Sequence, residues 1–410
     1  MKKIVKGSFD LMKQINISAI LNLIRKKSPI SRTDIVEQTG LAHGSVSKIT
    51  RGLLNLGFVR EIGIGESSGG RPPVFLQLDP NVGDVIGVNL GLGYIEAVLM
   101  NLESKVRVRS RIELKETNKE YVLEKIEKII FDIINREIQK DSIIGIGIAF
   151  HGIVDSSKGI SIFAPYYHFS NENIKEKFEK IFSLPVLVDN DVRAMAVGES
   201  WFGAAKGTEN FISVNVTSGI GSGIVIGGEL FTGVNYSAGE IGHILIDING
   251  PKCTCGNNGC LEVYVSHDRI IKKYIELIKS GMNSKIVKNL DKIKIEDICN
   301  AANIGDESAI KVIKEASSYL GVGLVDVVNM FNPTKIILSG EIMLSRKIVL
   351  EVVKKKINNR ALSKKAAEVI IEETKLGDNA ASIGGATLII KEFFKGKELF
   401  YNYFETKNEE

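Results

Sequence analysis

The spacing of apolar residues divides the chain into a short helical segment and a longer part in which strands and helices alternate. Apolar side chains recur at helical spacing over residues 14–27, 31–39 and 44–55, which predicts three short helices. Ser31, with Asp34 three residues later, resembles a capping box with a shorter acid, which would begin the second helix. An apolar strand at 74–78 follows a stretch rich in glycine and serine. Three helices followed by strands around a wing are the plan of a winged helix-turn-helix, which we expect for residues 1–80.

The third predicted helix separates polar side chains from apolar ones. Its exposed face is expected to carry hydroxyls and cations, which can reach phosphates or read base edges in the major groove. Arg71, in the glycine-rich wing tip, is suited to a minor groove, although a flexible tether explains that composition equally well. A protein-interaction module of the same shape is the alternative. The predicted DNA-binding residues are Ser31, Arg32, Ser45, Ser47, Lys48, Arg51 and Arg71.

Charge is distributed unevenly along the chain. Residues 1–80 hold twelve Lys/Arg and six Asp/Glu, a balance of +6, whereas the whole chain has a net charge of +4. The remaining residues therefore carry −2. A solvated surface can explain such a basic block, but its coincidence with the polar helix face favours DNA as the partner.

From residue 84 onward the pattern is that of an α/β protein. The predicted strands are 85–91, 94–102, 107–114, 143–150, 185–191, 211–216, 224–226, 229–232 and 335–339, and the predicted helices are 119–140, 192–202, 269–280, 295–303 and 307–331. A glycine-rich turn at 217–223 follows one strand, as a similar turn follows the strand at 85–91. This repetition indicates two related lobes, 81–190 and 191–380, with a cleft between them.

The segment 239–262 contains three of the four cysteines. His243, Cys253, Cys255 and Cys260 follow the spacing H-x9-C-x-C-x4-C, and one nitrogen with three sulfurs suits a closed, structural zinc site. A disulfide is the alternative, but a C-x-C pair is cramped and three cysteines cannot all pair. We therefore expect a structural zinc ion held between residues 243 and 260.

Composition excludes several classes of protein. Charged residues make up 25% and hydrophobic residues 44%, as in ordinary soluble proteins. A chain of 410 residues is expected to form two or three domains. The first ten residues are charged and polar, and no apolar run approaches the roughly 18 residues of a membrane span. Without a signal peptide or a membrane segment, a cytoplasmic location is expected.

Taken in order, these motifs resemble the ROK family of repressors, open reading frames and sugar kinases, in its repressor branch. The motifs are the helix-turn-helix, G-G-R-P-P, V-D-N-D, S-G-I-G-S-G, G-E-I-G-H and C-x-C-G-x-x-G-C-L-E, and they span nearly the whole chain. The resemblance implies two ribonuclease-H-like lobes of the actin-like ATPase type, with a closing helix near 380–397 joined to the first. It also implies that a sugar is bound by Asn190, Asp191, Glu240, His243 and Glu262, with His243 shared with the zinc.

The kinase chemistry of the family is not expected here. The family's kinase pattern Asp-x-Gly-Gly-Thr is replaced by Asn89-Leu90-Gly91-Leu92-Gly93, which removes a carboxylate expected near Mg²⁺ and a hydroxyl expected near phosphate. Glu341 stands where a glycine is expected on the nucleotide side. Asp191, the base in the kinases, is then vestigial, and ATP is not an expected ligand.

These features predict a sugar-responsive repressor of a carbohydrate-utilisation operon. It would bind double-stranded operator DNA as a homodimer or homotetramer and be released by an unphosphorylated monosaccharide, with xylose as the first candidate and glucose, N-acetylglucosamine and glucosides as others. The alternatives are an active ATP-dependent sugar kinase with a DNA-binding domain, and a repressor released by a partner protein or a sugar phosphate. Tyr166, Tyr167 and His168 fit either a sugar-stacking role or a core.

Overall fold

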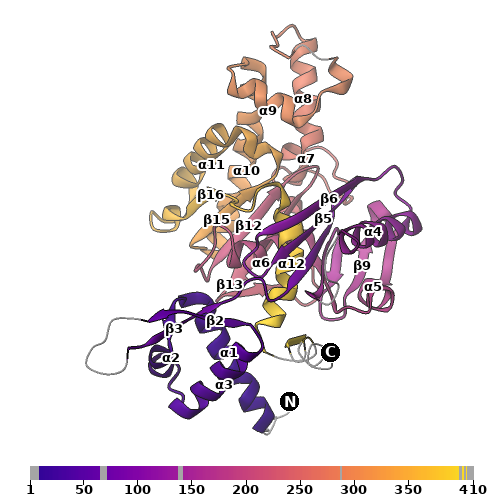
Figure 1. The fold of residues 1–410 in the computed structure, drawn as a ribbon. Helices are drawn as coiled ribbons and strands as arrows, with labels where there is room; N and C mark the ends of the chain where they lie inside the picture. The colour runs from indigo at the N-terminus through magenta and orange to yellow at the C-terminus, as the bar shows by residue number, and fades with distance from the viewer. Residues whose placement is uncertain are drawn as a thin grey trace.

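The chain folds into a small N-terminal domain and a larger body built on two five-stranded sheets (Figure 1). The computed structural model describes residues 9–64, 72–136, 142–286, 289–396, 399–400 and 403. The N-terminal domain lies at one end of the body, and Phe400, near the end of the described chain, packs on Phe58 of this domain with ring centroids 5.3 Å apart. The predicted α/β lobes and the helical N-terminal domain are both present.

The N-terminal domain combines three helices with a small antiparallel sheet of order β1-β3-β2. Its elements are α1 (Phe9–Lys27), β1 (Ile30–Ser31), α2 (Arg32–Thr39), α3 (His43–Asn55), β2 (Val59–Ile64) and β3 (Val74–Leu78). The predicted capping box is formed, since Ser31 Oγ accepts from the Asp34 N–H at 3.1 Å and Asp34 Oδ2 accepts from the Ser31 N–H at 2.9 Å. Gly40, at a φ of 68°, ends α2. The sheet adds a strand, β1, to a domain expected to be helical apart from its wing.

The first lobe is organised around a sheet of order β11-β7-β4-β5-β6. Its elements are β4 (Asp84–Leu90), β5 (Tyr94–Asn101), β6 (Val106–Glu113), α4 (Lys119–Ile134), β7 (Ile143–Phe150) and β11 (Val186–Asn190). Every residue of β4 and β7 is buried, as expected for parallel strands covered on both faces. The helix predicted for 119–140 is shorter, because α4 ends at Ile134 and residues 137–141 lie outside the described part.

A subdomain that the sequence did not predict separates β7 from β11. It contains the antiparallel strands β8 (Ile153–Asp155), β9 (Ile160–Ala164) and β10 (Phe169–Asn173), followed by α5 (Ile174–Phe182). The strands are short and partly polar, so they lack a clear alternating pattern. The helix buries Ile174, Phe178 and Phe182, a stripe only one residue wide.

The second lobe is organised around a sheet of order β14-β13-β12-β15-β16. Its strands are β12 (Phe211–Val216), β13 (Ile220–Ile226), β14 (Glu229–Phe231), β15 (Lys335–Ser339) and β16 (Ile370–Glu373). The glycine-rich turn predicted for 217–223 is therefore shorter, because β13 pairs with β12 from Ile220 onward. Only Thr217–Gly219 remain as the turn.

Five helices share a hydrophobic core with this second sheet. They are α7 (Glu262–Val265), α8 (His267–Lys279), α9 (Ile295–Asn303), α10 (Glu307–Phe331) and α11 (Arg346–Arg360). The bounds of α9 and α10 are those predicted, whereas α11 was not predicted. None of the helices in the described part of the chain combines the length and apolar character that crossing a membrane requires.

Two helices rich in small residues, α6 (Asp191–Trp201) and α12 (Ala380–Phe393), lie between the two sheets (Figure 1). They pack against each other, and α12 also lies on β4 and β7. A Cβ atom at Gly384 would overlap the backbone of Ala194, so these helices touch backbone to backbone. At its far end α12 enters the core of the N-terminal domain, where the rings of Phe393 and Phe58 are 5.2 Å apart.

We predict that Gly147→Ala destabilises the fold. A Cβ atom at this position of β7 would overlap the carbonyl oxygen of Gly385 in α12, and overpacking of this kind costs about 1–3 kcal/mol. The apparent Tm measured by differential scanning fluorimetry should fall. The matched control is Gly52→Ala in α3, where no atom lies within 4 Å and the Tm should hold or rise. Equal Tm values for Gly147→Ala and the wild type would contradict this packing.

Candidate functional site

Asn190 and Asp191 lie at the junction between β11 and α6. The Asn190 side chain caps the helix, since its Oδ1 accepts from the N–H groups of Val192 and Arg193, both at 3.0 Å. Its Nδ2 donates to the Gly152 carbonyl at 3.0 Å and to Asp191 Oδ1 at 2.9 Å. The amide of Asn190 is thus fully used within the protein, and it orients Asp191.

His151 belongs to the same site and was not predicted from the sequence. It follows β7, which is parallel to β11, so the residues after both strands meet at one edge of the sheet. His151 Nδ1 lies 3.8 Å from Asp191 Oδ2. The signal available in the sequence was a histidine at the carboxyl end of a buried strand that precedes the strand leading to Asp191.

Glu240 and Glu262 of the second lobe act electrostatically on this pair. Burial lowers the pKa of His151, but the neighbouring Asp191 carboxylate, with the charges of Glu240 and Glu262, outweighs it and raises the pKa overall. Partial desolvation raises the pKa of the Glu240 carboxyl; His243 opposes the rise, and Asp191 and Glu262 add to it. Ionisable side chains from both lobes therefore share one site.

Glu262 is held in place by the turn between β12 and β13. Its Oε2 accepts from the Ile220 N–H at 3.2 Å. A Cβ atom at Gly219 would lie 2.9 Å from the same oxygen, so this position of the turn favours glycine. Glu262 is also the first residue of α7, and helix and turn together direct its carboxylate.

A buried arginine ties the site together from behind. Arg193 in α6 is 2% exposed, and its Nε donates to Asp189 Oδ1 at 2.7 Å. The other two nitrogens donate to the carbonyls of Val154 at 2.7 Å and Tyr236 at 2.6 Å. A buried charge is tolerated when its donors are satisfied in this way. Arg193 thereby links α6 to the first lobe and to the segment that leads to Glu240.

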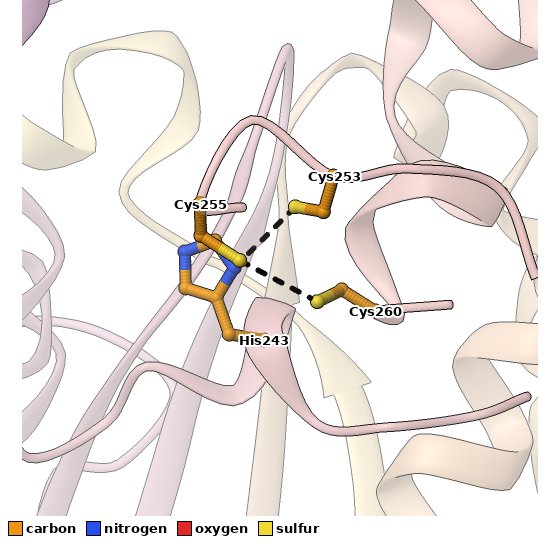
Figure 2. Close-up of side chains that lie close together, drawn as sticks. All are labelled: His243, Cys253, Cys255 and Cys260. Carbon is orange, nitrogen blue, oxygen red and sulfur yellow. Dashed lines mark hydrogen bonds between the residues drawn. The ribbon is translucent and has the colours of Figure 1, made fainter. Parts of the chain in front are cut away.

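The predicted metal ligands converge in the second lobe (Figure 2). His243 Nδ1 lies 3.7 Å from Cys253 Sγ, Cys255 Sγ lies 3.7 Å from Cys260 Sγ, and all four ligand atoms lie within 4.8 Å of one another. The cysteines are not joined by disulfides. A tetrahedral ion with bonds of about 2.0–2.3 Å needs ligand atoms about 3.3–3.8 Å apart. The cluster has the composition and spacing to hold a metal ion.

The loop after β4 is filled by tyrosine side chains. Asn89 is 5% exposed, and its Nδ2 faces the Tyr94 hydroxyl at 3.4 Å. The ring of Tyr94 lies so close to Gly91 that a Cβ atom there would overlap it, and Arg111 stacks on that ring at 3.8 Å. Desolvation raises the pKa of Tyr94 to about 12; Arg111 opposes the rise, and Glu341, followed by carboxylates that include Asp191, adds to it. Tyr94 therefore fills the space over Gly91 in this loop.

Tyr167 belongs to the core. It is fully buried, its hydroxyl donates to the Gly91 carbonyl, and it accepts from the Gly93 N–H at 2.7 Å. This fixes the loop after β4. Tyr166 and His168 on either side are exposed, so the alternative left open by the sequence is decided for Tyr167 only.

The polar face of α3 is exposed as predicted. Ser45, Ser47, Lys48 and Arg51 all lie on the surface, and Val46 and Leu53 are buried on the opposite face.

Ser31, which precedes α2, does not present its hydroxyl for the DNA contact that the sequence predicted. Ser31 is 4% exposed and its hydroxyl is used by the capping box, so we leave it out of the proposed DNA face. Arg32 donates to Thr50 Oγ1 at 3.2 Å and to Glu61 Oε1 at 3.0 Å, which ties α2 to α3 and β2. Arg71 lies outside the described residues.

Known repressors match nearly the full length of the chain. It is 33% identical over 383 residues to the xylose repressor of Bacillus subtilis, covering 93% of this chain and 96% of that protein. It is 34% identical over 391 residues to the DNA-binding transcriptional dual regulator NagC of Escherichia coli, with 95% and 96% covered.

Solved structures match either nearly the whole chain or about three quarters of it. A crystal structure of a ROK family transcriptional regulator, a homologue of the E. coli MLC protein, matches with a TM-score of 0.85 and 33% identity over 96% of this chain and 99% of that one. A ROK family glucokinase from Streptomyces griseus, in complex with glucose and AMPPNP, matches with a TM-score of 0.69 and 27% identity over 75% and 99%. The ROK family model matches residues 85–392. The chain belongs to the ROK family.

Proposed function

We propose that this protein is a transcriptional repressor of a carbohydrate-utilisation operon, released from operator DNA by a sugar. The named repressors match the chain through its N-terminal domain as well as its lobes, which supports DNA binding as part of the activity. The exposed face of α3, with Ser45, Ser47, Lys48 and Arg51, is the proposed surface for the major groove. Two copies, as a dimer or within a tetramer, would read a two-fold symmetric operator.

The single observation that carries the proposal is the course of α6. The helix begins with Asp191 in the carboxylate site and ends with Trp201, whose ring lies 3.8 Å from the guanidinium of Arg25 in α1. Arg25 also lies 5.6 Å from the Phe394 ring, and burial lowers its pKa to about 10. One rigid helix thus connects the proposed sugar site with the DNA-binding domain.

The carboxylates are the proposed sugar-binding groups. Asp191, Glu240 and Glu262 offer acceptors to sugar hydroxyls, and Asn190 orients Asp191. A sugar that binds one arrangement of the lobes better than another shifts the position of α6, and coupling of about 1–3 kcal/mol changes operator affinity roughly 5–150-fold. Xylose is the first candidate effector, followed by N-acetylglucosamine, because relatives carry these names.

Zinc is the proposed occupant of the Cys/His cluster, in a structural role. Four protein ligands leave no open position for chemistry. His243 lies three residues after Glu240, and Cys260 lies two residues before Glu262. A bound ion would therefore fix the backbone segments that carry Glu240 and Glu262 relative to each other. His243, as a metal ligand, would contribute to the sugar site by holding Glu240 in place.

Catalysis is not part of the proposed function. The position expected to carry a metal-binding carboxylate in the kinases holds Asn89, and the space over Gly91 is filled by Tyr94. The charge of Glu341 reaches Tyr94, whose pKa it raises, and would repel a nucleotide phosphate. These features oppose ATP binding beside Asp191.

The test is operator release. On a duplex selected by the protein from a random library, D-xylose, N-acetyl-D-glucosamine and D-glucose are titrated and DNA binding is followed by fluorescence anisotropy. At least one sugar should weaken binding at least fivefold. Glu262→Ala should keep DNA affinity and lose the response, whereas Lys48→Ala with Arg51→Ala should lose DNA affinity and keep sugar binding.

Three outcomes would contradict the proposal. The absence of a response to any mono- or disaccharide would remove the sugar-sensing part. Sugar-dependent ATP turnover in a coupled assay would instead support a kinase with an appended DNA-binding domain. Release by xylose phosphate alone would point to a phosphorylated effector.

Cys255→Ser should remove zinc and the sugar response together. Losing one thiolate leaves three ligands, and the segments that carry Glu240 and Glu262 lose their common anchor. Zinc content is measured by mass spectrometry, and sugar binding by calorimetry. Cys299→Ser is the matched control, since this buried cysteine lies outside the cluster. A Cys255→Ser protein that lacks zinc and responds normally would refute the structural role of the ion.

A further inference from the structure

The proposed sugar site is rich in hydrogen-bond acceptors and poor in donors. When they are ionised, Asp191, Glu240 and Glu262 can accept hydrogen bonds but cannot donate them. A sugar hydroxyl donates one hydrogen bond and accepts others, so tight recognition of a hydroxyl pair also needs a donor from the protein. The donors that the protein offers at this site therefore decide which sugar oxygens it can recognise.

The polar side chains nearest the carboxylates have already used their donors. Both N–H groups of the Asn190 amide are donated to Gly152 and Asp191. The guanidinium of Arg193 is buried and donates to Asp189 and to two backbone carbonyls. The Asn190 amide has no donor left for a ligand, and burial keeps the Arg193 guanidinium away from one.

His151 differs from these residues. Its Nδ1 faces Asp191 Oδ2 at 3.8 Å, and its side chain remains 30% exposed. Its ring makes an edge-on contact with Tyr167, with centroids 6.5 Å apart, and Tyr167 is fixed by its bonds to the loop after β4. Within the part of the chain that the structure describes, Nε2 of His151 has no hydrogen-bond partner in the protein.

We propose that His151 also contacts the effector sugar and determines specificity. Its Nε2–H donates a hydrogen bond to one sugar oxygen, and Asp191 accepts a hydrogen bond from the hydroxyl on the adjacent carbon. This inference rests on the proposed function, because it names a residue of the same site. The pair His151–Asp191 offers one donor and one acceptor side by side, which matches two vicinal oxygens of a neutral monosaccharide. Three carboxylates around a single imidazole disfavour a sugar phosphate or a sugar acid.

The test uses calorimetry with D-xylose, D-glucose and N-acetyl-D-glucosamine, and continues with whichever binds the wild type. His151→Ala should raise the Kd about tenfold or more, the usual effect of losing one hydrogen bond that involves a charged group. His151→Gln places an N–H near the position of Nε2 and should recover most of the affinity. His43→Ala, a histidine substitution in the N-terminal domain, should leave the Kd unchanged.

Deoxy analogues of the binding sugar separate contact from structure. If Nε2 donates to one hydroxyl, the analogue that lacks it should bind the wild type and His151→Ala equally, while the other analogues retain the difference. A uniform loss across all analogues, with no recovery in His151→Gln, would overturn a direct contact. Wild-type affinity in His151→Ala would overturn this inference alone, whereas a wild type that binds no sugar would overturn the proposed function and this inference with it.

Discussion

The backbone contact between α6 and α12 is the constraint on which the rest of the structure depends. Gly384 allows α12 to touch α6, and Gly147 allows it to touch β7, so that the helix pair fills the space between the two sheets. The pair also fixes both ends of the proposed signal path. The first residue of α6 is Asp191, and α12 ends among aromatic rings of the N-terminal domain. In the proposed mechanism, movement between the lobes would thus reach the DNA-binding helices through packed helices.

Buried polar groups give the site its precision. Arg193 donates to Asp189 and to the carbonyls of two separate segments. The Asn190 amide caps α6 and donates to Asp191. Such networks are costly if broken and specify one arrangement when complete. The carboxylates are thus presented by a rigid frame on the first lobe and by the Cys/His segment on the second. A sugar bound between them, as proposed, would contact both lobes.

The sequence predicted those features that depend on local pattern. The capping box at Ser31, the strand Ile143–Phe150 and the ligand spacing His243–Cys260 follow from periodicity or side-chain chemistry, and each has its predicted place. The helices α5 and α11 were missed although their buried residues recur every four positions, because one-residue stripes give a weak signal among charged side chains.

Features that depend on tertiary contact could not be predicted. To predict that His151 lies beside Asp191, one would need to know that β7 and β11 are parallel neighbours. To predict that Tyr94 fills the loop after β4, one would need to know that its ring packs over Gly91. Ser31 was predicted both to cap a helix and to contact DNA, and its burial, which favours the cap, follows from packing that the sequence does not reveal.

Trp201 offers the most direct measurement of the central claim, that α6 carries the sugar signal to the DNA-binding domain. It is the one tryptophan of the chain and lies against Arg25 at the junction. Its fluorescence is recorded while the effector sugar is titrated, in parallel with operator release. If α6 carries the signal, the emission should change saturably, with the same midpoint as operator release. Operator release with unchanged Trp201 emission would contradict it.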